Sequence, residues 1–181
     1  MNYLTDQAGV PIADANPLPI KLSGSNTRKT VSDTILFGGA TLGAHHAGDI
    51  LSVAAGEILQ FDTGFPAGSS GIILSSLVTL NQDAVFAGGA GYTLHLWNVT
   101  QTPIADNAAF SLASLTGYIG KIDISTLVDY GAMCAVNDVG HNLDFTLAAG
   151  DTKLYGMLVC KGSDTTIDAK TMTINLGIAA L

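Results

Sequence analysis

Apolar and polar residues alternate with a period of two in several short segments of this chain. The clearest is 171–178, where Met, Ile and Leu occupy every second position and Thr, Asn and Gly separate them. Successive side chains of a β-strand point to opposite faces, so this pattern predicts a strand with one face on a core and the other in water. The same reasoning predicts strands at 49–53, 57–62, 72–80, 92–98, 118–124 and 143–147.

One further predicted strand, 154–160, is apolar on both faces. Its apolar residues divide into Leu154, Leu158 and Cys160 on one face and Tyr155, Met157 and Val159 on the other. A contiguous apolar patch on a soluble protein marks an interaction site, so both faces of this strand should be covered. We expect an N-terminal arm or a neighbouring subunit to cover Tyr155, Met157 and Val159.

These strands define the fold class. No segment of ten or more residues shows the 3.6-residue period of an amphipathic helix, and 106–112 and 125–133 have room for only a turn or two of helix each. Gly, Asp, Asn and Ser separate the strands at short intervals, which is typical of antiparallel all-β domains. We therefore expect an all-β, jelly-roll-like two-sheet antiparallel sandwich with an extended N-terminal arm.

The arm is predicted from its prolines. Pro11, Pro17 and Pro19 fall within nine residues, and each fixes its own φ and moves the preceding residue out of the α region. Leu18, Ile20 and Leu22 alternate along this extended stretch and could fill pockets on one side of a partner. The predicted division is an arm over 1–45 and a β-sandwich body over 46–181.

Charge is scarce and negative. Charged residues make up 12% of the 181 residues, about half the usual share, and the net charge is −8. The negative balance and the lack of clustered Lys and Arg argue against direct binding of nucleic acid. Low charge is typical of subunit interfaces, so we expect a homo-oligomer. No membrane segment and no secretory signal is predicted, which favours synthesis in a reducing cytoplasm.

Three groups of residues invite a chemical interpretation. His45 and His46 with Glu57 suggest a cupin-like metal site, but adjacent strand side chains diverge, so two loop histidines are the expected alternative. His95 beside Trp97 suggests a sugar platform, for which packing is the expected alternative. The polar residues of the third group suggest a Ca²⁺ site, but their types favour a turn: Asp138, His141, Asn142 and Asp144.

No nucleophile motif or phosphate-binding loop is present in the sequence. The expectation is therefore a protein that is not an enzyme and has no catalytic residues, cofactor or metal. Such a chain would act through its surfaces and its assembly.

Several phrases resemble accessory structural proteins of tailed bacteriophage virions. They are the opening at 5–11 and 16–20, the segments 104–110 and 117–122, and the ending at 154–159 and 171–174. The resemblance implies a non-enzymatic virion component, a head decoration or cement protein, whose body stands on the capsid while the arm lies across it. Such proteins commonly form dimers or trimers.

The expected function is to bind the major capsid protein and stabilise the head by bridging capsomers. The protein would be made in the host cytoplasm and reside on the capsid surface of the virion. The expected capsid or inter-subunit contacts are Pro17, Leu18, Pro19, Ile20, Leu22, Tyr155, Met157 and Val159. Two alternatives stay open: a tail, neck or fibre component of the virion, and a carbohydrate-binding jelly-roll module.

Overall fold

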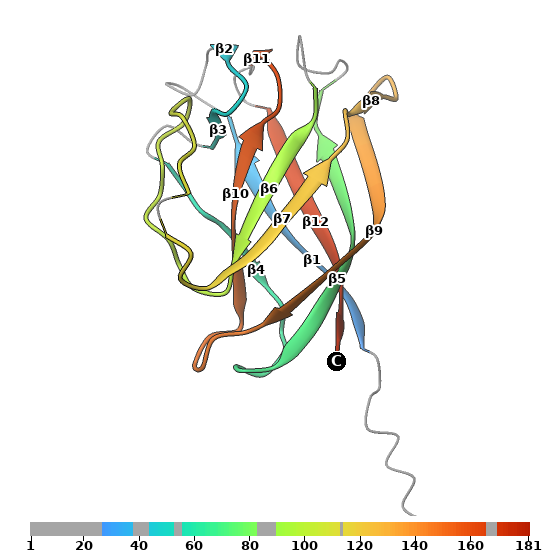
Figure 1. Ribbon diagram of the computed structural model, residues 1–181. Coiled ribbons are helices and arrows are strands. Elements are labelled where there is room, and N and C mark those ends of the chain that lie inside the picture. The colour runs from blue at the N-terminus through green and yellow to red at the C-terminus, as the bar shows by residue number, and fades with distance from the viewer. Residues whose placement is uncertain (1–26, 38–43, 53–55, 83–89, 113, 166–169) are drawn as a thin grey trace, which may run out of the picture.

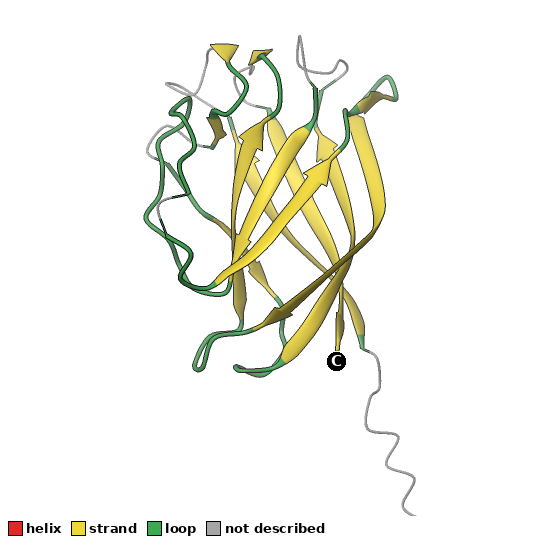
Figure 2. Ribbon diagram, in the orientation of Figure 1, coloured by secondary structure: helices red, strands yellow, loops and turns green. Residues whose placement is uncertain are grey.

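The computed structural model describes residues 27–37, 44–52, 56–82, 90–112, 114–165 and 170–181. These residues form an all-β structure without helices (Figure 2). None of them belongs to a helix that could cross a membrane. The strands are β1 (Arg28–Leu36), β2 (Ala44–His45), β3 (Ile50–Leu51), β4 (Leu59–Asp62), β5 (Ser70–Leu80), β6 (Tyr92–Trp97), β7 (Tyr118–Ile124), β8 (Val128–Asp129), β9 (Cys134–Thr146), β10 (Lys153–Cys160), β11 (Asp164–Thr165) and β12 (Thr171–Ala180).

The strands form two facing antiparallel sheets, as predicted. One has the order β1-β12-β5-β9-β8, and the other has the order β3-β10-β6-β7 with β4 also paired to β10. In Figure 1, β10, β6 and β7 lie nearest the viewer, with β1 and β12 behind them. A separate two-stranded pair joins β11 and β2.

The pairing of the eight longer strands is nested. The first pairs with the last, β1 with β12, and β4 pairs with β10. Inside these, β5 pairs with β9 and β6 pairs with β7. An eight-stranded chain folded back on itself in this way gives two sheets, β1-β12-β5-β9 and β4-β10-β6-β7, which is the arrangement of a jelly roll. The expected fold class is confirmed.

The core lies between the sheets and follows the alternation of the sequence. On β12, Met172, Ile174 and Leu176 are fully buried, while the intervening Thr and Asn residues are partly exposed. The inner faces of β5, β6 and β10 contribute to the same cluster. The hydrophobic effect acting on one face of each strand therefore accounts for the sandwich.

The predicted boundary of the arm is wrong at its C-terminal end. Arg28–Leu36 is a nine-residue strand at the edge of a sheet, paired with β12 over its full length. Val31 and Ile35 are its buried apolar residues, so its alternation was too sparse to predict a strand. Residues 1–26 of the predicted arm lie outside the described residues. They include the predicted contacts Pro17, Leu18, Pro19, Ile20 and Leu22.

A second correction concerns β9. The structure has no helical turn at 125–133 and no turn at 138–144. The predicted strand 143–147 is the end of the 13-residue strand β9. The register shifts where Ser75 pairs with Val139 and Ile73 with Leu143, so Gly140, His141 and Asn142 face a single residue of β5. This bulge interrupts the period of two and hides the strand in the sequence. The segment 106–112 also contains no helix.

Candidate functional site

The long connection between β6 and β7, residues 98–117, covers the outer face of β10. A second apolar cluster forms there from Ile50, Trp97, Met157 and Val159, with Ile104 and Phe110 of the connection packed against it. Met157 is 5% exposed and Val159 is 7% exposed. The chain itself therefore covers this face, and the prediction that Met157 and Val159 contact another subunit or a capsid is wrong.

Tyr155, the third residue of that predicted contact, is half-buried. Its hydroxyl donates a hydrogen bond of 2.7 Å to Oδ2 of Asp151. This bond holds the pKa of Asp151 below its ordinary value and raises the pKa of Tyr155 to about 12. The pair secures the β9–β10 turn, so Tyr155 serves the fold of the chain.

Backbone hydrogen bonds attach the connection to the short strand β3. The amide of Ile50 donates to the carbonyl of Ala108 at 2.9 Å, and the amide of Asn107 donates to the carbonyl of Ile50 at 3.0 Å. The amide of Phe110 donates to the carbonyl of Gly48 at 2.8 Å. Residues 107–110 therefore lie beside β3 almost as an additional strand.

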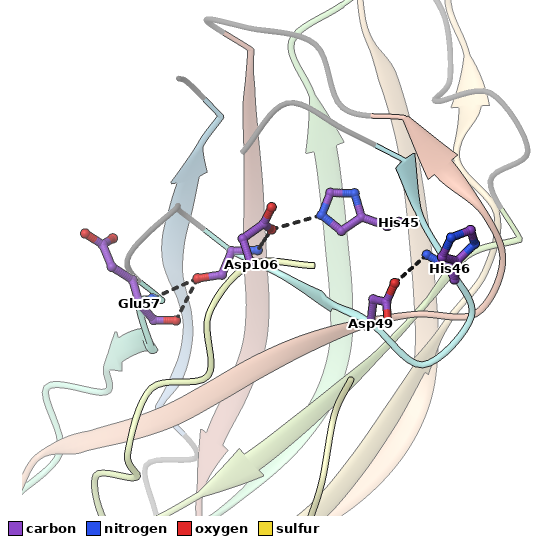
Figure 3. A network of polar contacts seen from close by, with 6 residues as sticks. His45, His46, Asp49, Glu57 and Asp106 are labelled. Carbon is purple, nitrogen blue, oxygen red and sulfur yellow. Dashed lines mark hydrogen bonds and ion pairs between the residues drawn. The ribbon is translucent and has the colours of Figure 1, made fainter. Parts of the chain in front are cut away.

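A buried carboxylate fixes the same segment by its side chain. Oδ1 of Asp106 lies 3.0 Å from Nε2 of His45 and accepts a hydrogen bond of 2.9 Å from the amide of Ser52 (Figure 3). The side chains of His45 and Asp106 are 0% and 5% exposed. Because buried polar groups need partners, Asp106 ties the connection to both β2 and the end of β3. We call His45, Ser52 and Asp106 the carboxylate clamp.

The structure separates the residues of the suggested metal site. His45 turns toward Asp106, whereas the amide of His46 donates to Oδ2 of Asp49 at 2.7 Å. Glu57 bonds Ser52 through its backbone, and its carboxylate points away from both imidazoles in Figure 3. The described part of the chain contains no group of three or more His, Cys, Asp or Glu residues that could hold a metal. His45 is also not a loop residue, because it lies in β2 and is fully buried.

Packing, and not an exposed platform, is the role of Trp97. It is 2% exposed and lies 5.3 Å from the ring of Tyr118 between centroids. His95 stacks near Phe110 at 4.2 Å, and its Nδ1 lies 3.0 Å from the hydroxyl of Tyr118. Burial lowers the pKa of His95, and the positive charge of Lys121 lowers it further. The lowered pKa favours the neutral form of His95, which packs within an aromatic cluster under the connection.

A cleft of about 300 Å³ opens beside this cluster. Its lining residues are Trp97, Gln101, Thr102, Pro103, Ile104, Phe110, Ser111, Ser114 and Met157. Nε1 of Trp97 is buried and has no hydrogen-bond acceptor among the described residues. None of the lining side chains titrates, so the cleft can offer apolar walls with hydroxyl and amide groups.

Three of the four polar residues of the suggested Ca²⁺ site bond within the protein, and the fourth, Asp144, is exposed. Asp138 accepts hydrogen bonds from the amide and hydroxyl of Ser125, at 2.8 and 2.9 Å. His141 bonds the hydroxyl of Ser76 at 2.9 Å, and burial lowers its pKa. Asn142 bonds the carbonyl of Gly140 and has a positive φ of 48°. These bonds shape the bulge of β9, where the sequence predicted a turn.

Comparison with known proteins adds no assignment. No protein-family model matches the chain, and no curated protein matches it. The interpretation of function therefore depends on the sequence and on the geometry described above.

Proposed function

We propose that this chain is a non-enzymatic structural protein of a tailed bacteriophage virion, a decoration or cement protein of the head. The observation that supports this most is the position of β1. It is the edge strand of its sheet and begins at Arg28, so the described chain enters the sandwich at a sheet edge. A segment in that position can extend to a neighbouring protein without disturbing the sandwich.

The segment around Pro17–Leu22 is the proposed contact with the shell. Its prolines favour an extended conformation on sequence grounds, and an extended segment can pair with an exposed strand edge of a partner while alternate side chains fill pockets. The partner in this proposal is the major capsid protein. Many weakly attached copies would then bridge neighbouring capsomers, because linked attachments reinforce one another.

The phage-like phrase at 104–110 supports the same proposal in a different way. It contains Asp106 of the carboxylate clamp and Phe110 of the aromatic cluster. The phrase thus coincides with the segment that closes the second apolar cluster.

Deletion of residues 1–26 tests the arm. The variant keeps Arg28–Leu36, which the sheet requires. Heads that lack the protein are mixed with purified variants, and attachment is measured by co-sedimentation. Deletion of 1–26 should abolish attachment, while a control lacking only 1–10 should retain it. Full attachment of the longer deletion would disprove the arm proposal.

The place of the protein within the virion is a separate question. Immunogold labelling or a virion reconstruction should show the protein on the head surface. Density on the tail, neck or fibres would support the alternative virion role.

One observation favours a second candidate function, carbohydrate binding. The cleft beside Trp97 combines apolar walls with hydroxyl and amide groups. Trp97 is the only Trp of the chain, so its fluorescence reports on the cleft directly. A glycan array followed by fluorescence titration should give no signal if the protein is purely structural, and a saturable signal if it binds sugar.

A further inference from the structure

The edge strand β1 carries two charged residues on its inner face. Val31 and Ile35 of this strand belong to the core. Because alternate residues of a strand share a face, Lys29 and Asp33 point the same way. Both charged residues are partly buried. Inward-pointing charges on an edge strand are one means by which β-proteins resist the addition of a further strand.

Both side chains bond backbone groups at the edge of the other sheet. Oδ2 of Asp33 accepts a hydrogen bond of 2.6 Å from the amide of Gln60 in β4. Gln60 lies opposite Tyr155 of β10 in the register, but its amide is directed to β1. Nζ of Lys29 donates to the carbonyl of Gly64, just beyond β4, at 3.0 Å. One donor and one acceptor at this edge are therefore occupied.

These bonds close one open side of the sandwich. β1 is the outermost strand of its sheet, and β4 pairs only with β10 among the described strands. β1 and β4 lie side by side, and no backbone ladder joins them in the described sheets. A strand added to either edge would have to displace the side chains of Lys29 and Asp33 from their backbone partners.

The opposite side of the sandwich has the same kind of contact. Asp138 lies on the same side of β9 as Cys134, a fully buried core residue. Its carboxylate accepts hydrogen bonds from the amide and hydroxyl of Ser125, which directly follows β7, at 2.8 and 2.9 Å. β7 is the outermost strand of its sheet, and β9 is bordered there by only the two-residue strand β8. An inward-pointing Asp thus bonds an edge amide on each side.

We propose that Asp33, Asp138 and Lys29 are edge caps, side chains that keep the sheet edges closed to strands from other molecules. A free amide and a free carbonyl at a sheet edge form a template for another strand. The edge caps occupy such groups, and an added strand would also have to enclose their charges, which is costly because an enclosed charge loses its water. The edge caps act in the isolated protein and are independent of the virion role proposed above.

The exposure of the edge caps separates this role from a contribution to stability. The bonds that Asp33, Lys29 and Asp138 make to the backbone all lie at exposed positions. Water can replace a lost partner at such a position, so removal of a cap should change the stability of the fold little. It should instead raise the rate at which molecules associate through the opened edges.

Aggregation kinetics test the edge caps. Full-length variants are stirred at equal concentration in about 0.5 M NaCl, which screens the net charge of −8. Light scattering and thioflavin T fluorescence follow the formation of β-sheet assemblies. Asp33→Ala and Asp138→Ala should each assemble roughly tenfold faster than the unmodified protein, because each opens an edge amide.

Two controls separate the opening of an edge from other causes. Asp144→Ala removes the same charge from the outer face of β9, where the side chain is exposed, and should assemble at the rate of the unmodified protein. Met157→Ala creates a cavity under the 98–117 connection without opening an edge. Urea unfolding gives the stability of every variant, and Met157→Ala should assemble more slowly than either Asp variant even though it is less stable.

Circular dichroism verifies that each variant is folded, and if one Asp variant does not fold, the other decides. Unchanged kinetics in Asp33→Ala and Asp138→Ala would refute the proposal. An equal acceleration by Asp144→Ala would refute it as well, because the effect would then follow the net charge. If Met157→Ala assembles fastest, assembly follows lost stability and proceeds through the unfolded chain, which would also disprove the edge caps.

Discussion

The two sheets have the same inward apolar alternation, but their outer faces differ. On the β10–β6 side the outer residues are apolar, and the chain covers them with its own 98–117 connection. On the β1–β12–β5–β9 side the outer residues are mostly Thr, Ser and Asn, and no described segment of the chain covers them. Apolar outer residues therefore indicate a segment that returns over the sheet, whereas uncharged polar residues can remain exposed or meet another molecule.

The largest effect should come from the carboxylate clamp, which holds the cover in place. Asp106→Ala removes from a buried site the carboxylate that contacts the imidazole of His45 and accepts the hydrogen bond from the amide of Ser52. Loss of one partner in such a site should lower the free energy of unfolding by about 3 kcal/mol.

Urea unfolding measures this change. His46→Ala, next to the clamp but outside it, is the control and should change stability by less than about 0.5 kcal/mol, since it alters an exposed side chain. An equal effect of both substitutions would contradict the assigned role of Asp106.

A somewhat smaller effect is expected at Met157, which lies under the cover. Met157→Ala should lower the free energy of unfolding by about 2 kcal/mol or more, as for a buried large-to-small substitution. The fluorescence of Trp97, a neighbour in the same cluster, should shift to longer wavelength. A change within about 0.5 kcal/mol would mean that the 98–117 connection does not cover β10 in solution.

The third prediction concerns pH. The pKa of Asp151 is lowered in the folded protein, chiefly by the hydrogen bond from Tyr155. The resulting stability is present above the unfolded pKa near 3.9 and is lost as pH falls through the lower folded value. Both groups are near solvent, so the loss should stay below about 1 kcal/mol.

At alkaline pH, the contribution of Tyr155 to stability changes with pH in the opposite direction. Because the pKa of Tyr155 is raised to about 12, its contribution is present below the unfolded pKa near 10 and disappears as pH rises toward 12. Tyr155→Phe should flatten both limbs in unfolding curves measured against pH. Unchanged limbs in this variant would assign the pH dependence to other groups.

The smallest effect is expected on the outer face of the β1-β12-β5-β9-β8 sheet. Val139 is 75% exposed, so Val139→Ser should change the free energy of unfolding by no more than about 0.5 kcal/mol. Thermal unfolding of the protein gives this value. A cost comparable to that of Met157→Ala would mean that both outer faces are covered in the monomer.

The sequence alone predicted the fold class because most strands keep a strict period of two. It did not predict β1, in which Val31 and Ile35 are the buried apolar residues. It also missed most of β9, because a bulge there places three residues opposite one residue of β5. The pattern at 154–160 correctly required a cover on both faces but could not identify the covering segment. That identity depends on contacts such as Asp106 with His45, which lie 61 positions apart.

In the sequence, the outer face of the β1-β12-β5-β9-β8 sheet could be recognised only as separate residues expected to face water. Thr171, Thr173 and Asn175 were assigned to solvent because they alternate with the core residues of β12. The register of β12, β5 and β9 was needed to show that these residues form one surface with Leu77 and Val139. Local pattern therefore gives the direction of a side chain, and topology gives its neighbours.

The nested pairing of first and last strands has a practical consequence for fusion proteins. Arg28 pairs with Ala179, so a domain joined after Leu181 would emerge beside the exit of the N-terminal segment. The hairpin between β8 and β9 lies at the opposite end of the sandwich in Figure 1, and its Tyr130 is 68% exposed. A peptide displayed at Gly131 would therefore project away from Arg28 and Leu181.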